Sequence, residues 1–169
     1  MTTAFRAPEP VGAADRNLRA DEILFRRAEG LAAASDVSAL SRFLLGRNLG
    51  ILCRDANSAE AGLFASAASE MGAHVAFIPV SLTDQSSLSV IRETARMLAR
   101  LYDGVECLDM SPLLVELMQE SAPIPFFLGL STETQRTGAL VERLSRLSCV
   151  QSTARRRLLQ AALAQALAS

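Results

Sequence analysis

The stretch RNLGILCRDANSAEAGLFASAASEMGAHVAFIP, residues 47–79, contains two short apolar runs separated by an amphipathic segment. The runs Leu49–Cys53 and His74–Ile78 have the length of buried strands, and Ser58–Met71 between them has helical spacing. Gly72 follows this segment, at a position where helix C-termini favour glycine. A strand, a helix and a second strand in this order predict two parallel strands joined by a crossover helix.

The same alternation continues along the chain. Further strands are predicted at Val105–Leu108 and Ile124–Leu128, and further helices at Ser89–Tyr102, Ser111–Ser121 and Thr132–Leu147. Four strand–helix repeats predict an α/β fold of three layers, a four-stranded parallel sheet with helices on both faces. Ligands of such sheets bind at the carboxyl ends of the strands.

Segments on either side of these repeats complete a predicted single domain over residues 20–169. Two N-terminal helices are predicted, one from Asp21 and one over Asp36–Leu45, together with one C-terminal helix over Gln151–Leu167. Residues 1–19 have the composition of a flexible N-terminal segment without function.

Composition excludes several classes of function. The chain of 169 residues has a net charge of -1 and interspersed charges, which argues against a nucleic-acid or membrane partner. It contains no lysine, which excludes Schiff-base chemistry and a Walker-type phosphate site. The N-terminus has no apolar segment of signal-peptide length, and no stretch approaches the length of a membrane span, so we expect a cytoplasmic protein.

Two groups of reactive or charged residues are expected to be structural. Cys53, Cys107 and Cys149 are widely spaced beside apolar runs, which predicts small buried side chains rather than a disulfide or a metal site. The triplet Arg155–Arg157 is expected to face solvent or to pair with carboxylates rather than to bind phosphate. We therefore expect no metal and no cofactor.

Over about residues 20–147, several blocks resemble the aspartate/ornithine carbamoyltransferase family, in order and without a gap. Leu45–Leu52 is similar to the family's entry into its first strand, and Met71–Val75 resembles its Leu-Gly-Ala-His-Val. Glu93–Leu98 resembles its Asp-Thr-Ala-Arg-Val-Leu helix, and Gly129–Ser131 matches its Gly-Leu-Thr. The resemblance implies the fold of the carbamoyl-phosphate-binding N-terminal domain of that family.

The resemblance places the family's phosphate loop, Ser-Thr-Arg-Thr-Arg, on Asn57-Ser58-Ala59-Glu60-Ala61. In the family, hydroxyls, backbone N–H groups and arginine meet the phosphate there. Here both arginines are replaced by alanine, and Glu60 stands where a hydroxyl faced the phosphate. Like charges ~4 Å apart repel by roughly 4 kcal/mol at an effective dielectric constant near 20, although a glutamate in the first turn also suits the helix dipole.

Other family residues are replaced as well. The arginine that ends the third strand falls at Leu108, the His and Gln of His-Pro-x-Gln fall at Gln135 and Gly138, and the lysine from a neighbouring subunit falls near Ser87. Each missing oxyanion donor is usually worth ~3–4 kcal/mol of transition-state stabilisation. The resemblance thus implies no catalytic residue. The vestigial cleft is expected to contain Asn57, Ser58, Ala59, Glu60, Leu108, Gln135 and Gly138.

The sequence favours a pseudoenzyme, a non-catalytic scaffold or regulatory subunit. It is expected to form a homo-oligomer, with a trimer favoured, or a hetero-oligomer with a full-length carbamoyltransferase. One alternative is an amino-acid or amine ligand in the remodelled cleft, and another is transferase activity completed by a partner chain. An unrelated flavodoxin-like domain is a further alternative. The family's second domain is expected to have been lost between about Leu147 and Gln151.

Overall fold

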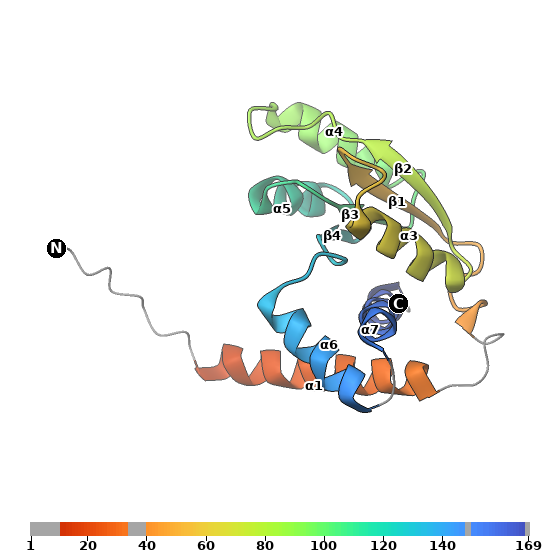
Figure 1. Cartoon of the computed structure of the whole chain (residues 1–169). Helices are drawn as coiled ribbons and strands as arrows, with labels where there is room; N and C mark the ends of the chain where they lie inside the picture. Colours follow the sequence, from red (N-terminus) through yellow and green to blue (C-terminus); the bar gives the residue numbers. More distant parts are fainter. Residues whose placement is uncertain (1–10, 34–39, 148–149, 168–169) are drawn as a thin grey trace.

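The computed structural model describes residues 11–33, 40–147 and 150–167, and of residues 11–18 and 135–136 it describes the backbone only (Figure 1). In chain order the elements are α1 Val11–Ala33, β1 Asn48–Cys53, α3 Ala59–Glu70, β2 His74–Pro79, α4 Leu88–Leu98, β3 Gly104–Cys107, α5 Pro112–Ser121, β4 Phe126–Leu128, α6 Gln135–Leu147 and α7 Gln151–Leu167. The strands form one parallel sheet in the order β2-β1-β3-β4. The predicted α/β fold with a four-stranded parallel sheet is confirmed.

Three helices of the repeats begin with a serine cap at the same edge of the sheet. The hydroxyl oxygens of Ser58, Ser87 and Ser111 accept hydrogen bonds from backbone N–H groups in the first turns of α3, α4 and α5. A serine at this position satisfies an N–H group that has no partner within the helix. Pro112 follows its cap as the first residue of α5, as the sequence predicts.

Gly72 ends α3 in a conformation that suits glycine. Its φ is 91°, and a Cβ atom there would lie 2.2 Å from the carbonyl oxygen of Ser41. The backbone N–H of Leu44 donates to the carbonyl oxygen of Met71 at 2.7 Å. The turns that precede β1 therefore pack directly on the turn between α3 and β2, which leaves no space for a side chain at position 72.

The two faces of the sheet are covered by different pairs of helices. Leu49 and Ile51 of β1 are fully buried in a cluster with residues of α3 and α7. Leu52 of β1 and Val105 of β3 face the opposite side, in a cluster with residues of α4 and α5. The alternation along β1 therefore places one apolar set on each face, as expected of a parallel sheet buried on both sides.

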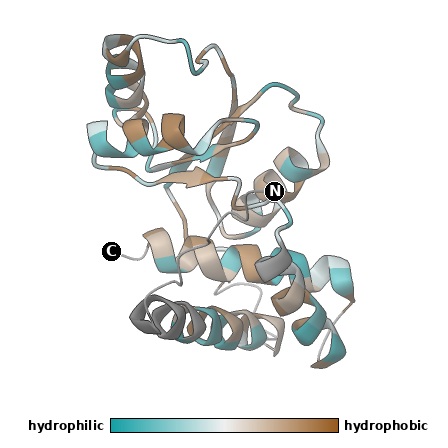
Figure 2. Ribbon diagram, turned by 90° about the vertical axis from the view of Figure 1, so that its left-hand side faces the viewer, coloured by the Kyte–Doolittle hydropathy of each residue, from teal (hydrophilic) through white to brown (hydrophobic). Residues whose placement is uncertain are grey.

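Helix α7 lies between the sheet and a further layer made of α1 and α6 (Figures 1 and 2). Leu159 and Leu163 belong to the cluster under β1 and α3. Leu158, on another face of the same helix, packs with Phe25 of α1 and Leu144 of α6. The helix therefore has two apolar faces, because it separates two layers of structure.

Helix α6 does not cover the sheet, in contrast to the prediction for the fourth repeat. It packs on α7 and α1, where Leu140, Val141 and Leu144 are buried. The face of the sheet that α6 would cover is occupied by α3 and α7. The predicted three layers are therefore present, with α1 and α6 added outside α7 as a fourth.

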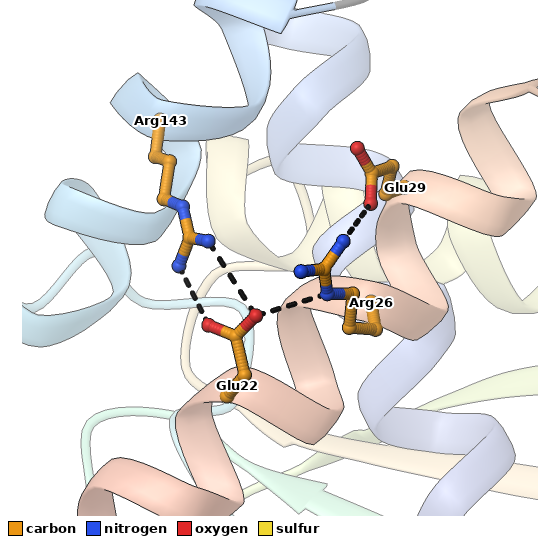
Figure 3. Close-up of polar contacts among 4 residues, drawn as sticks. All are labelled: Glu22, Arg26, Glu29 and Arg143. Atoms are coloured by element: carbon orange, nitrogen blue, oxygen red, sulfur yellow. Dashed lines mark hydrogen bonds and ion pairs between the residues drawn. The ribbon is translucent and has the colours of Figure 1, made fainter.

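Charged residues join α6 to α1 at the surface (Figure 3). The Arg143 Nη1 atom donates to Glu22 Oε2 at 2.8 Å, and Arg143 lies 3.8 Å over the ring of Phe25. Arg26 donates to Glu22 and to Glu29 from the next turns of α1. Hydrogen bonding to Arg143 holds the pKa of Glu22 below its ordinary value. These exposed contacts orient α6 on α1 more than they stabilise it, because solvent screens them.

A buried polar network fastens α7 to α3. The side-chain amide of Gln160 is fully buried, and its Nε2 atom donates to the Ala67 carbonyl at 3.2 Å and to Glu70 Oε2 at 2.8 Å. Arg157 donates to Gln160 Oε1 at 2.7 Å, and Arg156 pairs with Glu70 at 2.8 Å. The amide is hydrogen-bonded at both its nitrogen and its oxygen, so its burial carries little penalty.

Two predictions about the N-terminal part differ from the structure. Helix α1 begins at Val11 rather than Asp21, so residues 11–19 are helical and do not belong to a flexible segment; residues 1–10 lie outside the described residues. Of the predicted helix Asp36–Leu45, residues 34–39 are outside the description, and residues 41–46 form turns with hydrogen bonds three residues apart.

The expected structural roles are confirmed for the described cysteines and for two of the three arginines. Cys53 and Cys107 are buried free thiols, and Cys149 lies outside the described residues. Arg155 pairs with Glu133 at 3.5 Å and Arg156 with Glu70, whereas Arg157 is half-buried and donates to the Gln160 amide instead of a carboxylate. Among the described helices, none is long and apolar enough to cross a membrane.

Replacing Leu163 by alanine should lower the free energy of unfolding by about 2–5 kcal/mol, because the substitution leaves a cavity between α7, β1 and α3. Urea unfolding followed by circular dichroism measures this change. The exposed Gln165→Ala on the same helix is the matched control, with an expected change within about 0.5 kcal/mol. Equal effects of the two substitutions would contradict the central position of α7.

Candidate functional site

The candidate site lies at the carboxyl ends of the strands, where the loop after β1 leads into α3. The Asn57 backbone N–H donates to Asp55 Oδ1 at 2.8 Å, and the Ser58 N–H donates to the Asp55 carbonyl at 3.3 Å. The Ser58 hydroxyl accepts from the Ala61 N–H at 3.3 Å. Ser58 therefore acts as the N-cap of α3, and Asp55 holds the loop in a tight turn.

Carboxylates dominate the charge at this strand end. Asp55 is exposed, Glu60 is half-buried in the first turn of α3, and Asp109 follows β3 with a φ of 58°. Burial raises the pKa of the Cys53 thiol at the end of β1, and the negative charges of Asp55 and Asp109 raise it further. Arg54 is the only basic residue of the segment 54–60. The strand end therefore has the electrostatic character of a cation site rather than an anion site.

Two positions that carry arginine in the resembled family are filled by core residues here. Leu108 has 4% of its surface exposed and packs in the cluster under α3 and α7. Ala61 is fully buried in the same cluster. Ala59 is exposed. The apolar core therefore extends to the strand end at Leu108 and Ala61, and a longer charged side chain at either position would require the core to rearrange.

The start of α6 carries the other two predicted site positions. Thr134 and Thr137 each accept a hydrogen bond from the backbone N–H of the other, at 3.2 and 2.8 Å, and cap the helix reciprocally. A Cβ atom on Gly138 would lie 3.5 Å from Glu133 Oε1, which is ordinary contact. Gln135 is the first residue of α6, and its side chain lies outside the description.

A small cavity of about 50 Å³ lies beside the segment between β4 and α6. Its lining comes from α1, α3, α6, α7 and that segment, and comprises Leu24, Leu63, Leu130, Ser131, Thr132, Glu133, Thr137, Val141, Arg155, Leu158, Leu159 and Ala162. Residues of α3 and of the first turn of α6 therefore line the same cavity. Its lining includes none of Asn57, Ser58, Ala59, Glu60 or Leu108, so the predicted site residues do not share it.

The loop between β2 and α4 folds against its own chain. Ser87, where the family's intersubunit lysine aligns, caps α4. The Ser111 hydroxyl donates a short hydrogen bond to Asp84 in this loop. His74 is exposed at the start of β2, on the edge of the sheet opposite the strand ends, so the structure places it away from the candidate site.

Glu106 is a buried acid that sequence reasoning missed. Its side chain in β3 is fully buried, and its Oε1 atom accepts from the Ser131 N–H at 2.9 Å and the Ser131 hydroxyl at 2.8 Å. Its Oε2 atom has no hydrogen-bond partner in the part of the chain that the structure describes. Burial raises the pKa of this carboxyl, although the bonds from Ser131 oppose the rise. The signal in the sequence that indicates a buried acid is the single glutamate within the apolar strand run Val105–Leu108.

The site residues also bear on metal binding. Among the described residues, no three His, Cys, Asp or Glu side chains are grouped so that they could hold a metal ion. Glu106 is buried in the core, whereas Asp55 and Asp109, after the ends of β1 and β3, are exposed to solvent.

No family model matches the chain. The chain is similar to ornithine carbamoyltransferase of Cutibacterium acnes, with 32% identity over 102 residues that cover 60% of this chain and 30% of that protein. It is also similar to ornithine carbamoyltransferase of Limosilactobacillus reuteri, with 27% identity over 132 residues, 78% of this chain and 39% of that protein. The chain therefore spans between 30% and 39% of the length of these relatives.

Solved structures show the same relationship in the fold. Ornithine carbamoyltransferase from Pyrococcus furiosus matches with a TM-score of 0.61 and 20% identity, over 75% of this chain and 41% of that one. The catalytic subunit of M. jannaschii aspartate transcarbamoylase matches with a TM-score of 0.57 and 16% identity, over 75% and 42%. Ornithine and aspartate carbamoyltransferases are thus homologues of this chain, which corresponds to part of the larger enzymes.

Glu106 makes a testable contribution to the pH dependence of stability. Its pKa is raised in the folded chain, so the unfolded chain releases this proton first and folding stability falls as pH rises above the ordinary glutamate range, near pH 4.3. Glu106→Gln keeps an oxygen acceptor for Ser131 and cannot titrate. We therefore expect the wild type to lose stability relative to Glu106→Gln as pH rises, measured by urea unfolding at a series of pH values.

Glu106→Leu separates hydrogen bonding from charge. It removes the acceptor for both Ser131 donors and should be less stable than Glu106→Gln by about 1–3 kcal/mol at every pH, because neither variant titrates at this position. A wild type and Glu106→Gln variant with parallel pH profiles would contradict the raised pKa.

Proposed function

We propose that this homologue of the ornithine and aspartate carbamoyltransferases is a non-catalytic member that acts as an assembly module. It would associate with copies of itself, in a trimer by family resemblance, or with a full-length carbamoyltransferase in the cytoplasm. In this role the carbamoyl-phosphate fold provides a surface, and the chemistry of the cleft is not used.

The negative charge at the carboxyl end of β1 is the observation that carries the proposal. A phosphate group at this helix N-terminus would meet Asp55, Glu60 and Asp109 together with a single basic residue of the loop, Arg54. The helix dipole and free N–H groups attract an anion, but each contributes only a partial charge. Full carboxylate charges at the same end oppose binding of a dianion.

The packing of the strand end supports the same proposal. The side chains at positions 61 and 108 are buried in the main core, so the structure offers no room for arginine there without repacking. The Ser58 hydroxyl oxygen accepts from the Ala61 N–H as the cap of α3, and its own O–H group stays free to donate. At positions 61 and 108, the arginines of the resembled family are replaced by core residues, which removes donors for a developing oxyanion.

The surface supports association with another chain. Large apolar side chains are exposed on several elements, among them Leu101 at 57%, Leu113 at 63% and Leu147 at 61%. Val150, between α6 and α7, is 74% exposed. Apolar side chains that form a contiguous surface patch with a rim of polar residues favour contacts with another protein.

A second candidate function follows from the same charges. A strand end with Asp55, Glu60 and Asp109 suits a cationic or zwitterionic ligand, such as an amine or amino acid, with Asn57 available for hydrogen bonding. Titration with amines and amino acids by thermal shift tests it. Stabilisation that disappears in Glu60→Gln would favour this ligand role over a purely structural loop.

Isothermal titration of the protein with carbamoyl phosphate tests the proposed loss of the phosphate site. We expect no saturable heat. This corresponds to a dissociation constant above about 1 mM and a binding free energy less favourable than about −4 kcal/mol. Glu60→Gln removes the repulsive charge and should also remain silent, because the missing cations are not restored. A full-length ornithine carbamoyltransferase is the positive control, and saturable binding by the wild-type chain contradicts the proposal.

A further inference from the structure

The outer face of α4 begins a row of exposed arginines. Arg92 and Arg96 of α4, and Arg100 two residues beyond its end, follow one another at four-residue intervals and make no ion pair within the described part of the chain. They line a shallow surface hollow with Ser89, Glu93 and Met97. Like charges four residues apart on a helix repel one another, so the row costs helix stability unless another group neutralises it.

The neighbouring helix carries the opposite charge. Glu116 and Glu120 of α5 are exposed at a four-residue interval, and Leu113 one turn earlier is 63% exposed. None of the ion pairs within the described residues includes either glutamate. Helices α4 and α5 lie side by side on the sheet face away from α7 (Figure 1), with their buried residues in one cluster. One flat face therefore holds a basic row beside an acidic row.

The two rows have the same spacing and the same register. Counted from the first residue of each helix, Leu88 and Pro112, Arg92 and Glu116 are both in the fifth position, and Arg96 and Glu120 are both in the ninth. Both helices follow parallel strands and begin at the same edge of the sheet. The two rows therefore begin near the same edge of the sheet and run in the same direction along their helices.

We infer that this face is a two-fold contact between two copies of the chain, with α4 of one copy on α5 of the other. A two-fold axis that runs along the helices between α4 and α5 brings each basic row onto the acidic row of the partner copy. Arg92 then faces Glu116 of the second copy, and Arg96 faces Glu120, in two equivalent sets. A face that carries both halves of its own complement closes with two copies.

Apolar side chains complete the contact. Met97 lies among the arginines and is 51% exposed, and Leu113 of α5 is 63% exposed. In the two-fold arrangement Leu113 meets the first turn of α4 of the other copy. The apolar centre and the charged rows together have the composition of a protein interface, with arginine and methionine among the residues that interfaces favour.

The inference rests on the proposed assembly role and assigns to it a surface and a symmetry. The two-fold contact would join two of the trimers that the family resemblance favours into a hexamer, or two single chains into a dimer, so the particle contains an even number of copies in either case. An acidic helix of another protein would fit the basic row alone and would leave Glu116 and Glu120 without a partner.

Charge reversal tests the inference through the mass of the particle, measured by light scattering over a dilution series. The wild-type particle should contain an even number of chains. Arg96→Glu and Glu120→Arg should each halve its mass, because each places like charges opposite one another at two equivalent positions. The double variant Arg96→Glu/Glu120→Arg restores opposite charges and should restore the wild-type mass.

Arg27→Glu is the matched control, because Arg27 is exposed on α1 and its reversal should leave the mass unchanged. Circular dichroism of each variant verifies that the fold is retained. A wild-type monomer contradicts this contact, and it contradicts the assembly role as well if the chain also fails to co-elute with a full-length carbamoyltransferase. An oligomer with an odd number of chains, or one whose mass is unchanged by both reversals, contradicts the α4–α5 contact alone.

Discussion

Leu163 of α7 packs beneath β1 and α3, while Leu158 of the same helix packs against Phe25 of α1 and Leu144 of α6. Because α7 is buried on both faces, it joins the layer of the sheet and α3 to the layer of α1 and α6. The sheet requires a cover on the α3 side, and α1 and α6 require a surface on which to bury their apolar residues. Both requirements are met by the last helix of the described chain, and the Gln160 network with α3 sets its position along its axis.

The same packing explains the state of the candidate site. Because α3 and α7 form a dense core under the sheet, the apolar cluster reaches the carboxyl ends of the strands at Leu108 and Ala61. The loop beyond that boundary carries Asp55 and Glu60, whose charges oppose an anion. Packing and charge thus act in the same direction, and a single substitution would not rebuild an anion site. The outer face of α4 and α5, by contrast, carries complementary charges that the fold itself leaves without partners.

Much of the fold could be predicted because its signals are local. Apolar runs of strand length, the Ser111-Pro112 start of α5 and Gly72 after α3 each act within a few residues. The position of α6 could not be predicted, because the sheet face that α6 was expected to cover is covered by α7, a later element of the chain. The start of α1 at Val11 was missed because residues 11–19 include few apolar side chains with a helical period.

The candidate site shows the same division. The replacement of arginines by alanine and leucine, and of a hydroxyl residue by glutamate, could be read directly from the sequence, because it concerns residue types. The apolar strand around Glu106 signals its burial, but its partner Ser131 could not be predicted, because it lies 25 residues later in the chain and the two meet only in the folded protein. The register between the charges of α4 and α5 also required the structure, since it depends on where each helix begins.

We propose that the carboxyl end of β1 does not accept a phosphate group. A crystal structure of the protein grown with carbamoyl phosphate examines this most directly. We expect the N-terminus of α3 to hold no phosphate, with Leu108 in the core and the Ser58 hydroxyl still bonded to the Ala61 N–H. A phosphate bound by the backbone N–H groups of α3, with the carboxylate of Glu60 turned away, would contradict the proposed loss of phosphate binding.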